Sequence, residues 1–121
     1  MTEAEWEFFR EYGGGCKVFV DKKSLSVSGD IVRVGIKHFL VPPGTDKRNQ
    51  KPVREIVFDK EFDLDRAHAR YHSITFTYMD GSVAAPLRTE PEWIEADKGS
   101  LAELNYVRTL VRPNKKRWWK F

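Results

Sequence analysis

The sequence predicts an α+β domain, with an antiparallel sheet of about six strands and one carboxyl-terminal helix packed on a sheet face. Three observations support this fold class. Apolar and polar residues alternate through most of the chain, as in strands that bury one side. Clusters of turn residues separate these segments. Only near the end do apolar residues, including Leu101, Leu104 and Val107, follow helical spacing.

The first half of the chain contains several expected strands. Residues 6–12 form a weak strand that ends in three consecutive glycines, and residues 17–21 and 25–27 are extended on either side of a turn. Ser-Gly-Asp at 28–30 is typical of a hairpin and leads into the alternating segment 31–41. A long exposed loop is therefore expected next, from Pro42 to Pro52.

Alternation resumes in the second half. Residues 55–64 and 70–79 are the expected strands, and Asp80-Gly81 predicts a two-residue hairpin turn into residues 82–87. Ser100 and Glu103 match a capping box, in which the Ser hydroxyl and the Glu carboxylate satisfy free backbone amides. A helix is therefore expected from Ser100 to Val111, before Pro113.

The charge distribution separates a body from a tail. Five of the 21 basic residues, but none of the 18 acidic ones, lie in residues 112–121. The remainder is slightly acidic, which argues against a specific nucleic-acid interface. No apolar run approaches the roughly 18 residues of a membrane span. We expect residues 1–111 to form a single domain followed by a basic, aromatic tail.

That tail has an unusual composition, with cations placed around two indole rings. Its candidate residues for binding an anion or a membrane surface are Lys115, Lys116, Arg117, Trp118, Trp119 and Lys120. Ten such residues alone would bind an anionic surface only weakly. The alternative is a tail that frays or folds its tryptophans back onto the domain, and we favour packing of at least one tryptophan.

Three histidines are candidate ligands for zinc or haem iron. His68 and His72 are four residues apart, which places both on one side of a helix or strand, and His38 is a candidate third ligand. There is no HExxH or CxxC motif, and a strand histidine is usually half-buried with one nitrogen satisfied. We therefore expect no metal and no cofactor.

Carboxylates recur at every second position in one predicted strand: Asp59, Glu61, Asp63 and Asp65. Such a row is a candidate site for a hard cation. An EF-hand is excluded, because Leu64 and Arg70 occupy the positions that require Gly and Glu. A solvated sheet face, balanced by Lys and Arg on neighbouring strands, is the simpler interpretation.

Catalytic motifs are absent from the sequence. There is no GxSxG or GxGxxG, and Gly13–Gly15 are not followed by the Lys-Ser/Thr of a phosphate-binding loop. Cys16 is the single cysteine, and no local motif supports its activation as a nucleophile. We therefore expect no enzymatic activity.

The order of several short motifs resembles the bacterial surface-adhesin protein E-like family. The matching features are Trp6, the segment 18–34, Glu-Phe-Asp-Leu at 61–64, residues 78–81, Trp93-Ile94, and Gly99-Ser100 before the last helix. The resemblance spans about Trp6 to Val111. It implies a small envelope or surface protein with a sheet and a carboxyl-terminal helix, in a family whose namesake members bind host matrix proteins and haem.

The sequence departs from the family pattern at a disulfide. Leu64 and, by spacing, Leu110 occupy the places where the family has a pair of cysteines, so an apolar contact is expected instead. Burying two leucines is worth roughly 1.5 to 3 kcal/mol each, comparable with a disulfide.

The resemblance also sets the expected role and location. It implies a non-enzymatic, envelope-associated binding or adhesion module for a protein or surface ligand, with a haem or metal carrier and an anion-binding tail as alternatives. The first residues carry acids and do not match a secretory signal. The expected location is therefore the periplasm or cell envelope by resemblance, or the cytoplasm if Met1 is the native start.

Overall fold

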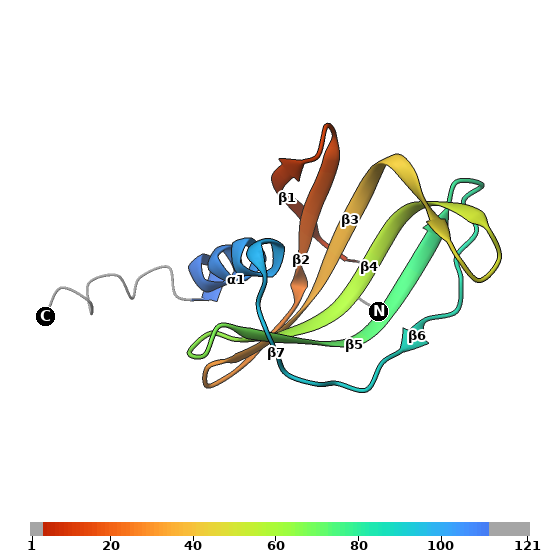
Figure 1. The fold of residues 1–121 in the computed structure, drawn as a ribbon. Coiled ribbons are helices and arrows are strands. Elements are labelled where there is room, and N and C mark those ends of the chain that lie inside the picture. Colours follow the sequence, from red (N-terminus) through yellow and green to blue (C-terminus); the bar gives the residue numbers. More distant parts are fainter. Residues whose placement is uncertain (1–3, 112–121) are drawn as a thin grey trace, which may run out of the picture.

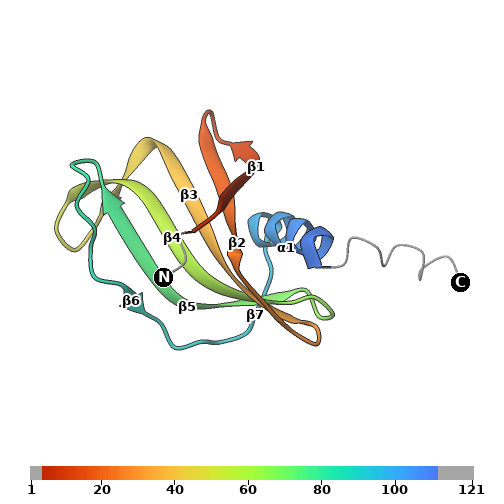
Figure 2. The same cartoon turned by 180° about the vertical axis from the view of Figure 1, so that it is seen from behind.

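The computed structural model describes residues 4–111, which fold into one antiparallel sheet and one carboxyl-terminal helix (Figures 1 and 2). The elements are β1 (Trp6–Tyr12), β2 (Cys16–Ser28), β3 (Ile31–Asp46), β4 (Lys51–Asp63), β5 (His68–Tyr78), β6 (Leu87–Arg88), β7 (Ile94–Glu95) and α1 (Lys98–Val111). Within these residues the sheet follows the order β1-β2-β3-β4-β5-β6, and β7 also pairs with β5. The expected sheet and helix are confirmed.

Strands β1 to β5 are joined in sequence as antiparallel neighbours, because short turns connect them. Gly29 and Gly81 have φ angles of 62° and 91°, which a residue with a side chain rarely adopts. A turn follows β5 as expected, but it is one residue longer than the predicted Asp80-Gly81 turn: the Gly81 amide donates to the Tyr78 carbonyl at 3.0 Å and the Tyr78 amide to the Ser82 carbonyl at 2.9 Å, so residues 79–81 connect the paired residues.

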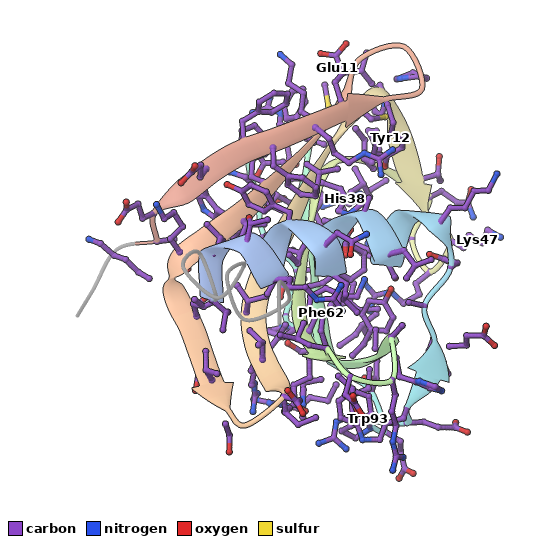
Figure 3. All side chains as sticks on the ribbon, turned by 90° about the vertical axis from the view of Figure 1, so that its left-hand side faces the viewer. Glu11, Tyr12, His38, Lys47, Phe62 and Trp93 are labelled. Atoms are coloured by element: carbon purple, nitrogen blue, oxygen red, sulfur yellow. The ribbon has the colours of Figure 1, made fainter. Side chains whose placement is uncertain are left out.

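The helix lies across one face of the sheet, called the inner face here (Figure 3). Alternation along the strands sends apolar side chains to this face, where they meet Leu104 and Val107 of α1. The buried core residues outside the helix are Val18, Val20, Val32, Val34, Ile36, Phe62, Leu64 and Ala69. Leu64 belongs to this core and Leu110 packs against it, so both contribute to one apolar cluster.

The opposite, outer face has no helical layer, because α1 is the one helix in residues 4–111 and it lies on the inner face. Most strand residues that alternate with the core therefore remain partly or fully exposed on this side. Many of them are charged, hydroxylated or aromatic, in contrast to the core. No helix in the described part of the chain is long and apolar enough to cross a membrane.

The expected long loop from Pro42 to Pro52 is wrong. Strand β3 continues to Asp46 and β4 starts at Lys51, so only residues 47–50 form the turn. Asp46 holds this turn, since its carboxylate accepts hydrogen bonds from the backbone and side chain of Arg48 at 2.8 to 3.0 Å. The polar composition of the segment suggested a loop, although its residues form the end of a β-hairpin.

Two smaller expectations also need correction. Residues 17–27 are not two strands around a turn, because β2 is continuous and contains an irregularity between Asp21 and Ser26. Residues 82–87 do not form a full strand: Val83 makes one isolated bridge to Thr77, and β6 contains only Leu87 and Arg88.

The capping box is also wrong, although the helix itself is confirmed. The cap is Asp97, whose carboxylate accepts the Ser100 amide at 2.8 Å, so the helix begins at Lys98. This bond lowers the pKa of Asp97. Ser100 and Glu103 point their side chains into the molecule and make different contacts.

Candidate functional site

A cavity of about 390 Å³ opens where the amino-terminal end of α1 meets the inner face of the sheet. Its aromatic walls are Tyr12, Phe58 and Tyr71. Its polar groups include His38, Lys60 and Glu103, and the space it encloses falls in the range of about 300 to 1,000 Å³ typical of ligand sites. We call this space the helix-end cavity.

A chain of hydrogen bonds runs along the helix-end cavity. The Tyr12 hydroxyl lies 3.0 Å from His38 Nδ1, and His38 Nε2 lies 3.0 Å from Glu103 Oε2. Lys60 Nζ donates to Glu103 Oε1 at 2.6 Å and to Ser100 Oγ at 2.9 Å. Because Tyr12 is on β1, His38 on β3, Lys60 on β4 and the other two on α1, the chain ties the helix to three strands.

The central ion pair is almost completely buried, with Lys60 2% and Glu103 3% exposed. Burial raises the pKa of Glu103, but the hydrogen bond from His38 and the Lys60 charge outweigh it, so the pKa lies below its usual value. The Lys60 ammonium also lies over the rings of Tyr71 and Phe62, 4.7 and 5.1 Å from their centroids. Every charge in the pair is therefore compensated, as burial requires.

At the mouth of the cavity, Tyr12 is 36% exposed and Arg10 is half-buried. The Arg10 guanidinium lies 5.7 Å from the Tyr12 ring centroid and forms no ion pair with any carboxylate in residues 4–111. Burial, with a contribution from Cys16, raises the pKa of Tyr12, so its hydroxyl stays protonated at neutral pH. The mouth therefore presents an aromatic ring beside a cation.

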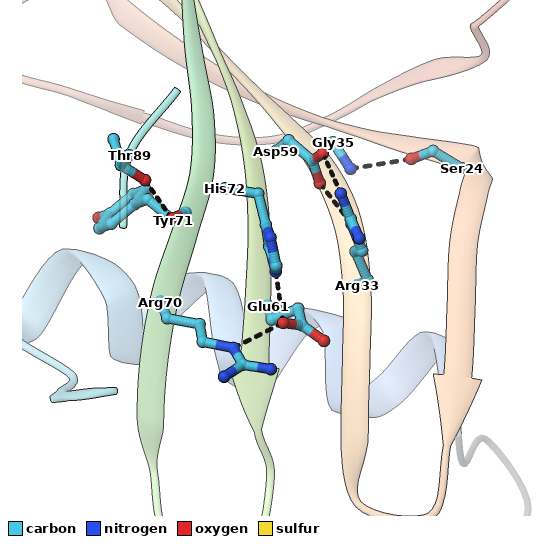
Figure 4. Close-up of polar contacts among 9 residues, drawn as sticks. All are labelled: Ser24, Arg33, Gly35, Asp59, Glu61, Arg70, Tyr71, His72 and Thr89. Carbon is cyan, nitrogen blue, oxygen red and sulfur yellow. Dashed lines mark hydrogen bonds and ion pairs between the residues drawn. The ribbon is translucent and has the colours of Figure 1, made fainter. Parts of the chain in front are cut away.

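A second hollow, of about 360 Å³, lies on the outer face and is called the outer-face hollow. Trp6 forms one wall and Gly35 the floor. Arg33 and Asp59 form a two-bonded ion pair at 2.9 and 2.7 Å on another side (Figure 4). The bonds from Arg33 lower the pKa of Asp59.

Beside this hollow, an aromatic strip follows β1 and β2. Lys37 Nζ lies 4.7 Å from the Trp6 ring centroid and 5.0 Å from that of Phe19. Phe8, which is 49% exposed, packs edge-on against Phe19 with centroids 5.7 Å apart. The outer face thus presents aromatic rings as well as polar groups.

The row of carboxylates falls into two environments. Asp59 and Glu61 lie on the outer face, where Arg33 pairs with the first and Arg70 and His72 contact the second (Figure 4). Asp63 accepts backbone amides in the β4–β5 turn, which also contains Asp65. Cross-strand cations balance Asp59 and Glu61, as the sequence suggested, whereas backbone amides take that place at Asp63.

The structure does not bring the three candidate histidines together. His38 lies on the inner face with Tyr12 and Glu103, whereas His72 contacts Glu61 on the outer face. His68 Nδ1 lies 2.8 Å from the Arg66 carbonyl near the β4–β5 turn. Residues 4–111 contain no group of three His, Cys, Asp or Glu that could hold a metal ion.

The remaining candidates are Cys16 and the residues of the tail. The Cys16 Sγ lies 3.3 Å from both the amide and the carbonyl of Val41. The tail candidates lie beyond residue 111, so their role stays a prediction: Lys115, Lys116, Arg117, Trp118, Trp119 and Lys120.

The sequence reasoning missed Lys60, Ser100 and Glu103. The sequence does indicate that Lys60 is unusual. Residues 58, 60 and 62 lie on the same face of the strand, so Lys60 takes a position on the inner face where an apolar residue is expected. A lysine placed there needs a buried acidic partner. That partner is Glu103, which the sequence analysis had placed in the capping box of the helix.

Comparisons with known proteins support the fold. No protein-family model matches the sequence, and no curated protein matches it significantly. Two structures of Haemophilus influenzae protein E are similar to the chain. The selenomethionine form is 14% identical, with a TM-score of 0.58 over 76% of this chain and 78% of that one. Crystal form II is 15% identical, with a TM-score of 0.60 over 76% and 80%. The chain therefore has a protein E-like fold.

Proposed function

We propose that this chain is a non-enzymatic, envelope-associated binding module whose protein ligand inserts a side chain into the helix-end cavity. The observation that supports this most directly is a preformed cavity with aromatic walls and an open, cationic mouth. Tyrosine and arginine are the residue types that most often dominate the binding energy of protein interfaces. The envelope location and the adhesion role rest on the resemblance to protein E.

The chemistry of the hydrogen-bonded chain favours binding over catalysis. Both nitrogens of His38 are engaged, one by Tyr12 and one by Glu103, so neither is free to act as a general base. Lys60 is held by Ser100 and Glu103 and lies against aromatic rings. These contacts fix the walls of the cavity, and a rigid site lowers the entropy lost on binding.

The charge at the mouth indicates the kind of segment that fits. Arg10 has no carboxylate partner among the described residues, whereas Lys60 deeper in the cavity is neutralised by Glu103. An acidic side chain on the partner would pair with Arg10, while a neighbouring apolar or aromatic side chain would enter between Tyr12 and Tyr71. The ligand is thus an exposed protein segment with an acidic residue beside an apolar one.

Binding to immobilised fibronectin, laminin and collagen, measured by biolayer interferometry, tests this function. The wild-type chain should bind at least one of them. Arg10→Ala should weaken that binding about tenfold or more, because it removes the cation from the mouth. The matched control is Arg66→Ala in the β4–β5 turn, which also removes an arginine without a carboxylate partner among residues 4–111 and should have no effect.

Two results would count against the proposal in different ways. If the wild-type chain binds none of the three matrix proteins, the adhesion function is wrong. If it binds one of them and Arg10→Ala binds equally well, the binding surface is not the helix-end cavity. Circular dichroism of both variants ensures that a loss of binding reflects the mouth and not the fold.

A further inference from the structure

The outer-face hollow contains hydroxyl groups that no other part of the described chain uses. The side-chain hydroxyls of Ser26, Ser73 and Thr75 line it, and none has a hydrogen-bond partner within residues 4–111. Ser24 differs, because its hydroxyl accepts the Gly35 amide at 2.8 Å and donates to the Asp21 carbonyl at 2.9 Å. Three groups that both donate and accept hydrogen bonds therefore face one space.

Gly35 allows the Trp6 ring to pack close to the sheet beside this space. A Cβ atom at this position would lie 3.3 Å from Ser24 Oγ and 3.5 Å from both Asp21 Cβ and the edge of the Trp6 ring. A larger side chain would fill the floor and displace the indole. The absence of a side chain thus lets the indole lie close to the backbone, which positions the Trp6 ring as a wall of the hollow.

The charged side chains that line the hollow already have partners. Arg33 and Asp59 form a two-bonded pair, with side chains that are 47% and 37% exposed. Asp21 accepts the backbone amides of Glu5 and Lys23 at 2.8 and 3.0 Å. Since Arg33, the one cation among the lining residues, is already paired and Asp21 adds a negative charge, the lining disfavours a phosphate or carboxylate ligand.

The Arg33–Asp59 pair still has unused hydrogen-bonding capacity. A guanidinium has five N–H donors, of which two point to Asp59, and each carboxylate oxygen can accept a second bond. A ligand with two adjacent hydroxyls suits this pair, because the hydroxyls can accept hydrogen bonds from the guanidinium and donate to the carboxylate. Lys37 lies against the Trp6 ring and helps to fix its position at the rim.

We propose that the outer-face hollow binds a neutral saccharide. Its C–H groups would contact the Trp6 ring, while its hydroxyls would bond to Ser73, Thr75 and the Arg33–Asp59 pair. This site is separate from the helix-end cavity and lies on the opposite face of the sheet. The proposal does not depend on the protein-binding function.

NMR titration of the ¹⁵N-labelled full chain tests it, with three neutral probes: maltotriose, cellotriose and triacetylchitotriose. At least one should shift the Gly35 and Ser73 amides and the Trp6 indole N–H, with a Kd on the order of 1 mM. The amides of Ser100 and Glu103, at the helix-end cavity, should not move.

A pair of identical substitutions on β5 provides the control. Thr75 lines the hollow, whereas Thr77 is two residues further along the same face and does not. Thr75→Val should weaken saccharide binding about three- to tenfold, because it removes one hydroxyl. Thr77→Val should leave the Kd unchanged. Valine suits a strand, so both variants should fold.

Three outcomes would overturn the proposal: no probe shifts these signals, the shifts map to the helix-end cavity, or Thr75→Val binds as tightly as Thr77→Val. A failure of matrix-protein binding, or its loss in Arg10→Ala, would leave this experiment unaffected. The saccharide site and the protein-binding site are thereby tested independently.

Discussion

The two faces of the sheet each carry an ion pair, but the pair on the inner face is buried and the pair on the outer face is exposed to solvent. On the inner face, Lys60 and Glu103 are buried together and connected to Ser100 and His38. On the outer face, Arg33 and Asp59 form a pair with comparable geometry but keep 47% and 37% of their side-chain surface exposed. The same type of interaction thus fixes the position of the helix on one side and orders a solvated surface on the other.

This difference follows from the solvent around each pair. In a buried site, a charge that loses its partner has neither water nor a counter-ion, so the loss is costly. At an exposed site, water replaces the lost partner and the pair contributes little. The two faces should therefore respond very differently to comparable substitutions.

The largest effect is expected when one buried charge is left alone. Lys60→Met should lower the free energy of unfolding by about 3 to 5 kcal/mol, because Glu103 would remain buried without its main counter-charge. The double variant Lys60→Met with Glu103→Leu should recover much of this loss. Urea denaturation measures both, and a single variant as stable as the wild type would mean that water reaches Glu103.

A second comparison concerns the two sides of the helix. Leu104 is 1% exposed in the core, whereas Leu101 is 37% exposed. Leu104→Ala should destabilise the chain by about 2 to 5 kcal/mol, since it leaves a cavity. Leu101→Ala should change stability by about 0.5 kcal/mol or less. Equal thermal shifts for the two variants would contradict the position of α1 on the inner face.

The buried pair also predicts a pH dependence. The pKa of Glu103 is lower in the folded chain than its ordinary value, so its contribution to stability is complete above that ordinary value, about 4.5, and falls as the pH drops through the folded pKa. The stability difference between wild type and Glu103→Gln should therefore shrink below about pH 4.5, by at most roughly 1.4 kcal/mol per pH unit. Denaturation at several pH values measures it, and a difference that grows on acidification would reverse the assigned sign.

The smallest effect is expected on the outer face. Arg33→Ala should cost about 0.2 to 1 kcal/mol, because its pair with Asp59 is half-exposed, and added salt should reduce this cost further. Thermal denaturation at low and high salt provides the measurement. A loss as large as that of Lys60→Met would show that the outer face is covered in the folded protein.

Much of the fold could be predicted because it depends on neighbouring residues. Alternation along residues 31–41 and 55–64 fixes which side chains share a face, and Asp80-Gly81 marks the place of a turn, although the turn spans residues 79–81. The prediction was less accurate where pairing overrode composition. Residues 42–46, with two prolines and no central apolar residue, extend β3 because residues 44–46 pair with β4.

The β5 strand shows a further limit of pattern reading. Asp59 pairs with Ser73 but the next residue, Lys60, pairs with Tyr71, so a bulge leaves His72 as an extra residue. Ala69 and Tyr71, and then Ile74 and Phe76, therefore face the inner side despite the change from odd to even positions. A strict period of two along the chain would have placed one of these pairs on the wrong face.

By itself, the sequence determined the sheet-and-helix class, the faces of the regular strands β3 and β4, and the helix near residues 100–111, since each depends on local spacing and turn chemistry. The tertiary structure decided the site. Glu103 meets Lys60 across 43 positions and His38 across 65, so their contact depends on strand register and on where α1 crosses the sheet. Local sequence allows two helix caps, either Asp97 or Ser100 with Glu103. Tertiary packing selected Asp97, which leaves the side chains of Ser100 and Glu103 to point inward.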